Sequence, residues 1–270
     1  NDIWKAAKKR EAQLIYGTTD KDHPGVQYLY DSIENYYIGG TLEISDLPKH
    51  YDYQLLRHTP EELIKQFKKM GWDKVVAFQT RNPMHRAHKE ISFRAATENG
   101  ANLLLHPVVG PTKPGDIDHY TRVRCYQKVL KYFPEGTTML SLLPLAMRMA
   151  GPREALWHAL IRKNYGCTHI IIGRDHAGVG NFYDPFAAHK IFNDFPELEI
   201  QPIFFPAFFY CKKCLTFTNP KVCPHDADAR EQISGTKLRE MIQNGQSPSE
   251  FILRPEVAKV IIDFDKPFVE

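Results

Sequence analysis

The chain has 270 residues, enough for one large domain or two smaller ones. Hydrophobic residues make up 43% and charged residues 25%, as in an ordinary globular protein, and no apolar run approaches the ~20 residues of a membrane-spanning helix. The net charge of +3 is mild and no dense lysine and arginine cluster predicts nucleic-acid binding, so we expect small anionic substrates.

The first fifty residues differ in character from the rest. Residues 1–12 are polar, predict the end of a helix and do not form a signal peptide, and the missing start Met leads us to expect a processed chain or a fragment. Turn-forming residues dominate Gly17–Val26, where we expect His23 to serve the structure of the loop. Residues Tyr36–Ile44 predict a strand with a glycine bend.

A helix start is encoded at Thr59. Thr59 can cap the helix, Pro60 suits its first position, and two glutamates fall in its first turn. We expect this helix to reach Met70 and to end before Gly71.

The segment Lys74–Glu90 changes character at Phe78. Val75–Phe78 is a short apolar run, typical of a strand buried on both faces of a parallel sheet. Residues 79–82 are polar and predict a tight turn, and Pro83 suits the first turn of a helix that we expect to extend to Thr97. Such a junction presents free N–H groups and a positive helix end at the carboxyl edge of a sheet, where anionic nucleotides bind.

Two histidines lie three residues apart at the start of this predicted helix. The spacing of His85 and His88 places both rings on one face, a few residues after Arg81. A cation and two imidazoles around a helix N-terminus suit a triphosphate. A buried metal pair, or two histidines on a solvated face, are the alternatives that the spacing leaves open.

Two further strand–helix units follow. Leu103–Val109 predicts a strand and Thr121–Phe133 a helix, and the loop between them carries Lys113, Asp116 and Asp118. These side chains could line a substrate pocket, or the prolines and glycines of the loop could merely shape a turn. Thr138–Met147 predicts the next strand with its exit loop, and Gly151–Gly166 the next helix.

A second cluster of polar residues follows the strand that we predict within Thr168–Gly178. Ile170–Ile172 is a buried run, and Gly173 would let the backbone approach a ligand closely. Arg174, Asp175 and His176 follow at its carboxyl end. An Arg–Asp ion pair that fixes a turn is the alternative to a binding role. Leu198–Tyr210 predicts a fifth strand with an aromatic exit.

Three cysteines and a histidine are grouped within fifteen residues. Cys211 and Cys214 have the spacing of a zinc knuckle, and Cys223 and His225 complete a four-ligand Cys3His set without an open position. Reduced surface cysteines are the alternative. The other two cysteines fall in apolar segments and predict buried thiols, so we expect a reducing, cytoplasmic setting.

The segment Ile233–Ile242 predicts a capped helix near the end of the chain. Ser234 and Thr236 can cap it, and Lys237 and Arg239 add positive charge, so it either faces phosphate or is an ordinary helix. A last helix is expected from Pro255.

Several strings carry a resemblance to a known family. H-x-x-H after a first strand resembles the signature of HxGH-type nucleotidylyltransferases, and ISGTKLRE resembles another element of that superfamily. QTRNPMHRAHKE, HPVVGPTKPGDIDHYTRVRCYQ and GRDHAG are more specific and resemble ATP sulfurylases (sulfate adenylyltransferases) over nearly the whole chain.

The resemblance implies an α/β fold, a Rossmann-like nucleotidylyltransferase parallel sheet. It implies a remnant of an N-terminal PUA-like, β-rich domain at residues 1–53 that lacks most of that domain, and the catalytic domain at 54–210. Residues 211–270 would form a zinc-stapled loop and a C-terminal helical piece, with no kinase domain after them.

The resemblance also implies the reaction, in which MgATP and sulfate give adenosine 5′-phosphosulfate and pyrophosphate reversibly, with structural Zn²⁺ beside Mg²⁺. We assign catalysis to Thr80, Arg81, Asn82, His85 and His88. We assign sulfate binding to Gln79, Arg81, Arg174 and the N–H of Ala177. We assign ATP binding to Gln79, Thr80, Arg81, Asn82, His85, His88, Gly173, Arg174, Asp175 and His176. The zinc ligands would be Cys211, Cys214, Cys223 and His225.

Two other functions stay open at this point. One is a related adenylyltransferase with a different acceptor, such as a pantetheine phosphate or nicotinamide mononucleotide, and the other is a non-catalytic truncated subunit. We expect a homodimer or larger homo-oligomer, with neither nucleic acid nor a membrane as partner.

Overall fold

The computed structural model describes residues 2–111, 115–205, 208–231, 240–242, 244–246, 248–264 and 266–269. The backbone forms two compact units. The first unit comprises residues 1–55, 148–158 and 175–196, and the second comprises residues 56–147, 159–174 and 197–270.

The first unit begins with a strand rather than the predicted end of a helix. β1 (Asp2–Lys5) pairs antiparallel with β2 (Tyr36–Gly39), which stops at the glycine bend instead of reaching Ile44. Between them lie α1 (Lys8–Tyr16) and α2 (Pro24–Asp31). The helix therefore starts only at Lys8, because residues 2–5 find a strand partner more than thirty residues away along the chain. The small core of the first unit contains Ala12, Tyr16, Val26, Leu29 and Ala150.

His23 has the structural role that the sequence predicts. It is fully buried and caps α2, because its Nδ1 accepts the Gly25 N–H at 3.0 Å. Its Nε2 lies 3.1 Å from the Met149 carbonyl oxygen and 2.9 Å from the Tyr183 hydroxyl. Gly25 is required beside it, since an added Cβ would come within 2.4 Å of the Tyr16 ring.

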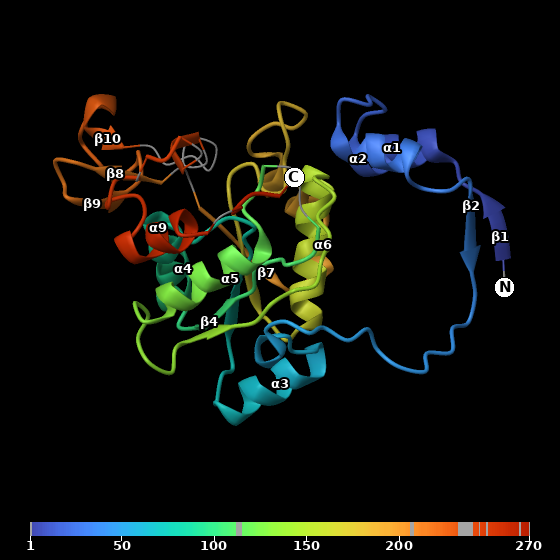
Figure 1. Cartoon of the computed structure of the whole chain (residues 1–270), viewed down its shortest axis with the longest axis horizontal. Helices are drawn as coiled ribbons and strands as arrows, with labels where there is room; N and C mark the ends of the chain where they lie inside the picture. The colour runs from blue at the N-terminus through green and yellow to red at the C-terminus, as the bar shows by residue number, and fades with distance from the viewer. Residues whose placement is uncertain are drawn as a thin grey trace. The chain divides into compact units, whose positions relative to one another are not determined.

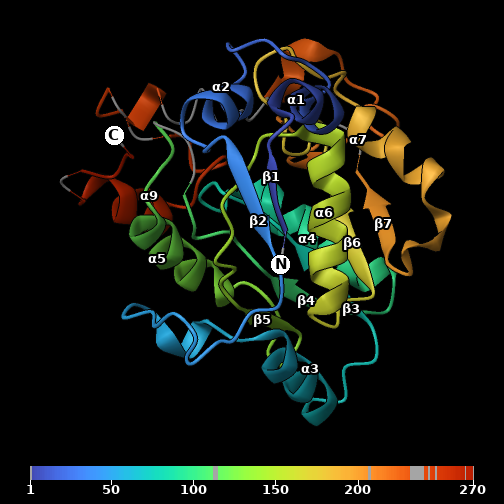
Figure 2. The same cartoon turned by 90° about the vertical axis from the view of Figure 1, so that its right-hand side faces the viewer.

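The second unit is built on a five-stranded parallel sheet in the order β5-β4-β3-β6-β7 (Figure 2). The chain runs outward from β3 through β4 to β5 and then returns to place β6 on the other side of β3. The carboxyl ends of β3 and β6 therefore flank a topological switch point, the usual ligand position in open α/β sheets. The strands span Val75–Phe78 (β3), Asn102–Leu105 (β4), Thr138–Leu140 (β5), His169–Ile172 (β6) and Gln201–Phe204 (β7).

Helices pack against this sheet and against one another. α4 packs on β3 and β4, α5 packs on β5, and α9 lies beside α5 (Figure 1). Every residue of β3 and β6 is buried, which is consistent with the α/β fold and explains why Val75–Phe78 and Ile170–Ile172 are apolar runs. The helices span Pro60–Lys69 (α3), Arg86–Glu98 (α4), His119–Leu130 (α5), Gly151–Asn164 (α6) and Pro255–Ile262 (α9).

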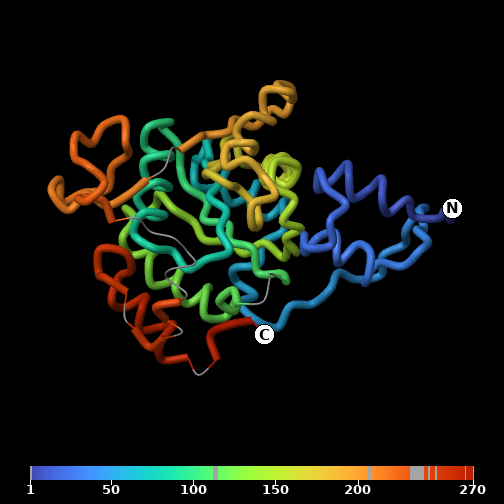
Figure 3. The backbone as a smooth tube through the Cα atoms, turned by 90° about the horizontal axis from the view of Figure 1, so that it is seen from above, coloured from blue at the N-terminus to red at the C-terminus, as the bar shows by residue number. Residues whose placement is uncertain are grey.

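Short elements complete the two units. The antiparallel sheet β10-β8-β9 carries the cysteine-rich segment, drawn in orange in Figure 3. Its strands span Phe209–Cys211 (β8), Thr216–Thr218 (β9) and Arg230–Glu231 (β10). The remaining single turns are η1 (Gln54–Leu56), α7 (Ala187–Lys190), η2 (Ile191–Asp194), η3 (Pro196–Leu198) and η4 (Ala227–Ala229).

Several predicted boundaries prove wrong by a few residues, whereas the helix from Thr59 is confirmed with a complete capping box. The strand predicted over Leu103–Val109 ends at Leu105, and that over Leu198–Tyr210 divides into β7 and β8. The predicted roles of Lys113, Ser234, Thr236, Lys237 and Arg239 fall outside the described residues. None of the described helices combines the length and the apolar character that crossing a bilayer requires.

Candidate active site and metal centre

The turn Gln79–Asn82 follows β3 directly, at the carboxyl edge of the sheet. Inside the turn, the Thr80 hydroxyl accepts the Asn82 N–H at 3.0 Å and donates to the Asn82 carbonyl at 3.2 Å. The Thr80 carbonyl in turn accepts the N–H of Val108, which follows the neighbouring strand β4. These contacts tie the turn to the exit of β4, so its polar side chains start from a fixed backbone.

The helix after the turn starts later than the sequence predicts. α4 begins at Arg86, and His85 rather than a residue before Pro83 is its N-cap. The His85 Nδ1 accepts the His88 N–H at 3.2 Å, which pairs one of the N–H groups that a helix start leaves open. An imidazole can therefore replace the usual hydroxyl or carboxylate cap, which the propensity rules did not suggest.

The rings of His85 and His88 stack at a centroid distance of 3.5 Å and an interplanar angle of 19°. Burial lowers the pKa of His85 well below its usual value, and the neighbouring His88 ring lowers it further. Burial also lowers the pKa of His88 to about 4. Both rings are therefore neutral at pH 7, and a bound polyanion would raise their pKa values again.

Arg81 pairs with a carboxylate from the next loop. Its Nε lies 3.9 Å from Oδ2 of Asp116, which is fully buried. Asp118, the other predicted pocket residue of that loop, instead caps α5, because its Oδ1 accepts the N–H groups of Tyr120 and Thr121. Of the two described loop carboxylates, only Asp116 is therefore placed to act on Arg81.

Gly173 and Arg174 follow β6, which pairs with β3 through Val76 and Ala77. Parallel neighbours end at the same edge of a sheet, so these two residues emerge beside the Gln79–Asn82 turn. A Cβ added at Gly173 would meet no atom within 4 Å, so there is open space in front of its backbone.

Asp175, His176 and Ala177 belong to the first unit and form a tight turn there. Asp175 and Ala177 adopt left-handed backbone angles, with φ of 53° and 56°. The Asp175 side chain packs closely on Gly178, where an added Cβ would lie 1.9 Å from Oδ1 and would displace the carboxylate. Such conformations are costly away from glycine and concentrate at functional sites.

A buried relay of side chains leads to His176. The His176 Nε2 lies 3.0 Å from Nδ1 of His158, whose Nε2 lies 3.2 Å from Oε1 of Glu154. The Glu154 carboxylate also accepts the backbone N–H groups of Arg148 and Ala150. Sequence reasoning missed Glu154 and His158, although their spacing of four residues on one helix was the available signal.

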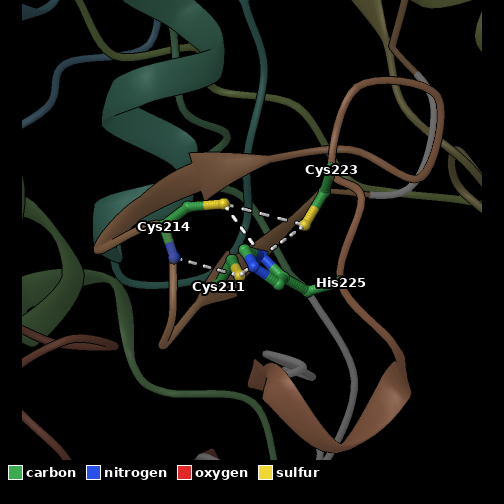
Figure 4. Close-up of side chains that lie close together, drawn as sticks. All are labelled: Cys211, Cys214, Cys223 and His225. Carbon is green, nitrogen blue, oxygen red and sulfur yellow. Dashed lines mark hydrogen bonds between the residues drawn. The ribbon is translucent and has the colours of Figure 1, made fainter.

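The four predicted metal ligands converge in the second unit (Figure 4). Nδ1 of His225 lies 3.4 Å from the Cys211 sulfur, 3.3 Å from the Cys214 sulfur and 3.9 Å from the Cys223 sulfur. The sulfurs of Cys214 and Cys223 are 3.9 Å apart. A tetrahedral zinc site with its usual bond lengths has edges of about 3.8 Å between sulfurs and about 3.6 Å between sulfur and nitrogen. The donor set therefore fits such a metal ion.

The surroundings of the cluster are built to hold these donors. Cys211 lies on β8, and Phe209, Cys211, Cys223 and Ala229 form a small apolar core. Burial raises the Cys211 pKa, but hydrogen bonds, first from the Cys214 and Lys213 backbone, lower it on balance to about 6. That shift favours the thiolate of Cys211, the form that binds metal, while the hydrogen bond with Cys211 raises the pKa of Cys214.

Comparison with known proteins places most of the chain in one family. Residues 54–264 match the ATP-sulfurylase family and residues 1–47 match the PUA-like domain family.

The chain belongs to the ATP-sulfurylase family.

A sulfate adenylyltransferase of Cenarchaeum symbiosum is 52% identical over 97% of this chain and 69% of its own length. One of Phaeosphaeria nodorum is 48% identical over 99% of this chain, which spans only 48% of that relative. A solved structure, the hexameric APS kinase from Thiobacillus denitrificans, superposes with a TM-score of 0.67 and 32% identity over 82% of this chain and 42% of its own. The two sequence relatives of this ATP-sulfurylase family member are thus sulfate adenylyltransferases by name, and the chain spans about half of the fungal one.

Proposed function

We propose that this chain transfers AMP from MgATP to sulfate, forming adenosine 5′-phosphosulfate and pyrophosphate in a reversible reaction. The observation that carries this proposal is the Gln79–Asn82 turn, which leads from a buried strand into a helix capped by one of two stacked histidines. The family membership and the names of the relatives support the same reaction.

The proposed chemistry requires no protein nucleophile. A sulfate oxygen attacks the α-phosphorus, the bond from that phosphorus to the oxygen that bridges to the β-phosphate breaks, and pyrophosphate leaves with the electron pair. Sulfate is already ionised at neutral pH, so no proton has to be removed. The protein's task is then to bring two anions together and to stabilise the charge on the transferring phosphoryl group and on pyrophosphate.

We propose that sulfate is bound by Gln79, Arg81 and Arg174, with the N–H of Ala177 as a further donor. Two guanidinium groups suit this ion because each offers several N–H donors in a planar fork. The neighbouring carboxyl ends of β3 and β6 support the pairing of Arg81 with Arg174. Ala177 is assigned from the GRDHAG motif alone.

His85 and His88 are proposed to stabilise the phosphates, with Thr80 and Asn82 on the pyrophosphate side. Their lowered pKa values mean that the free protein carries two neutral rings at this point. A triphosphate placed against them favours the charged forms, so binding is expected to take up protons from solution. This proton uptake is measurable as a buffer-dependent heat of binding.

We propose that Gly173, Asp175 and His176 contact the nucleotide. The open space in front of Gly173 supports its role. The hydrogen bond between His176 and His158 would fix the orientation of the His176 ring toward that ligand. Magnesium enters with the nucleotide as MgATP, where phosphate oxygens hold it and it neutralises part of their charge.

The test of this function is ATP formation from adenosine phosphosulfate, pyrophosphate and Mg²⁺, with Arg81→Ala as control. ATP from the wild type alone would support both the reaction and the sulfate pocket. A folded, metal-loaded wild type that forms no ATP would refute the proposal for this chain. An acceptor screen with ATP, including a pantetheine phosphate and nicotinamide mononucleotide, would then reveal a different adenylyltransferase.

We further propose that Cys211, Cys214, Cys223 and His225 hold a structural Zn²⁺. Four protein donors leave no position for a substrate, so the ion would fix the loop rather than take part in the reaction. Metal analysis of the purified protein tests this directly, and a metal content well below one per chain would contradict it.

Two properties of the whole protein are also proposals. We propose a homodimer or larger homo-oligomer, which the hexameric state of the structural relative supports. We propose a cytoplasmic location, because the five described cysteines are all free thiols and a thiol-rich chain suits a reducing compartment. Light scattering and cell fractionation test these two proposals.

A further inference from the structure

The Gln79–Asn82 turn is held from behind by two side chains of α5. The Arg122 Nη1 donates to the Arg81 carbonyl at 3.0 Å, and the Tyr126 hydroxyl donates to the Asn82 carbonyl at 2.8 Å. Arg122 and Tyr126 are four residues apart, so both reach the turn from the same face of the helix. The backbone of the turn is therefore set by two donors that belong to another element.

Arg122 also links the turn to the exit of the next strand. Its Nη1 donates to the Val108 carbonyl at 3.0 Å as well, so a single nitrogen joins the loops that follow β3 and β4. The side chain is only 1% exposed, and its Nε has no hydrogen-bond partner among the described residues. Both of these acceptors are neutral carbonyl oxygens, and the hydroxyl of Tyr126 interacts with the guanidinium as well.

A buried guanidinium held by neutral groups is costly in a folded protein. A neutral donor could make the same hydrogen bonds at lower cost, so the charge itself needs a reason. An anion bound at the turn supplies one, because a positive charge behind the turn attracts it through a medium of low dielectric constant. Arg122 would then both fix the backbone and raise the local potential.

The side chain of Arg81 is fixed at its other end by Asp116, at 3.9 Å. The backbone of Asp116 is in turn paired with the last described residues of the chain. Its carbonyl accepts the Val269 N–H at 2.8 Å, and the Gly115 N–H donates to the Val269 carbonyl at 2.9 Å. Arg81 is thus held at its backbone by Arg122 and at its guanidinium by Asp116.

We propose that Arg122 and Tyr126 are positioning residues, which hold the Gln79–Asn82 turn so that Arg81 presents its guanidinium to the sulfate group. This inference rests on the proposed function, since it assumes that the turn binds sulfate. Neither residue touches the substrate. Both act through the backbone carbonyls of the turn, and Arg122 adds its positive charge behind it.

Three variants test the proposal in the assay that forms ATP from adenosine phosphosulfate and pyrophosphate. Arg122→Met should lower kcat/KM for adenosine phosphosulfate by about a hundredfold, as misplacement of a binding group does. Arg122→Lys keeps the charge without the planar fork and should recover activity to within about tenfold of wild type. Tyr126→Phe removes only one hydroxyl and should cost about tenfold, so it keeps the test open if Arg122→Met does not fold.

Arg162→Lys is the matched control. Arg162 is also fully buried and donates to a backbone carbonyl, that of His106 at 3.0 Å, but this carbonyl lies outside the turn. The control should keep kcat/KM within about threefold of wild type at a temperature where all variants are folded. A loss in Arg162→Lys as large as that in Arg122→Met would overturn the specific role of Arg122.

A double-mutant cycle separates positioning from general stability. The affinity for adenosine phosphosulfate is measured by calorimetry for wild type, Arg122→Lys, Arg81→Ala and the double variant. If Arg122 acts by placing Arg81, its substitution should change affinity in the wild type and have almost no effect once Arg81 is alanine. Equal effects in both backgrounds, or none in either, would overturn the proposal. A wild type that neither forms ATP nor binds adenosine phosphosulfate would overturn the proposed function itself.

Discussion

The Gln79–Asn82 turn ends a fully buried parallel strand, whereas the Cys211–His225 cluster lies among antiparallel strands of only two or three residues. The turn has protein donors on its carbonyl groups, from Arg122, Tyr126 and the Val108 N–H. The cluster has a small apolar core, and its four polar donors face one another.

This difference shows two physical ways in which a protein can hold a set of polar groups in a fixed arrangement. In the turn, the hydrophobic sheet and buried hydrogen bonds supply the rigidity before any ligand arrives, so binding need not order the backbone. In the cluster, the converging sulfurs and imidazole need a cation between them to offset their mutual repulsion. Loss of ligand should therefore affect folding in the cluster and only function in the turn.

Metal removal is expected to have the largest effect. Chelation, or Cys223→Ser, should unfold residues 208–231, because structural zinc in small domains contributes on the order of 10 kcal/mol. Limited proteolysis should then cleave within this segment, while ATP formation falls less than about tenfold because the sheet stays folded. Complete loss of activity together with global unfolding would show that the two regions are not independent.

Arg81→Ala should come next in size. Loss of this guanidinium should lower sulfate-dependent turnover by about a thousandfold or more, or about 4 kcal/mol, because it removes charge that meets the developing anion. The free energy of unfolding, measured in urea, should change little. An unchanged rate would refute the assignment of Arg81, and a large loss of stability would remove the contrast with the cluster.

His88→Ala should lower turnover by on the order of a hundredfold, since an imidazole beside the phosphates stabilises transition-state charge. Steady-state kinetics with MgATP distinguish the possible roles of the ring. A change confined to the KM for MgATP would assign His88 to ground-state binding instead. His85→Ala is less suitable, because it also removes the cap of α4.

Acid should produce the smallest of these effects. Burial lowers the pKa of His88 to about 4, so between pH 6.5 and pH 4 the unfolded chain binds a proton that the folded chain does not. The contribution of the neutral His88 ring to the free energy of unfolding is complete above pH 6.5. It is lost as the pH falls, by about 1–1.5 kcal/mol at pH 5.5. Urea titrations at pH 7 and pH 5.5 measure how much the free energy of unfolding falls with acid. This fall should be smaller for His88→Gln than for wild type, and equal falls would contradict the lowered pKa of His88.

The sequence alone predicted the features that depend on local pattern. Val75–Phe78 and Ile170–Ile172 were recognisable as buried strands because parallel strands bury both faces and read as apolar runs. The cysteine spacing predicted the converging ligands, His225 included, because a knuckle and its partners require set intervals.

Buried polar side chains were not predictable in the same way. Arg122 and Arg124 stand two residues apart on one helix, yet Arg122 is buried and Arg124 is exposed. Which arginine faces the turn depends on how α5 packs on the sheet, and a charged helix residue is on average exposed. Glu154 and His158 escaped notice for the same reason.

The start of α4 was predicted three residues too early because proline favours a first helical turn. The His85 ring competes for the capping position and moves the start to Arg86. Boundary errors of this kind arise because a cap depends on the side chain that accepts the hydrogen bond, which propensity does not specify.

The strand order has a consequence for the course of folding. β3, β4 and β5 are consecutive in the chain, whereas β6 reaches β3 across contacts such as the hydrogen bond from Val75 to Thr168, 93 residues apart. Because long loops close slowly, we expect the β3–β5 half, with α5 and its arginine behind the turn, to form first. The strand that precedes Arg174 is then added later, so the folding chain holds half of the proposed anion site before the other half exists.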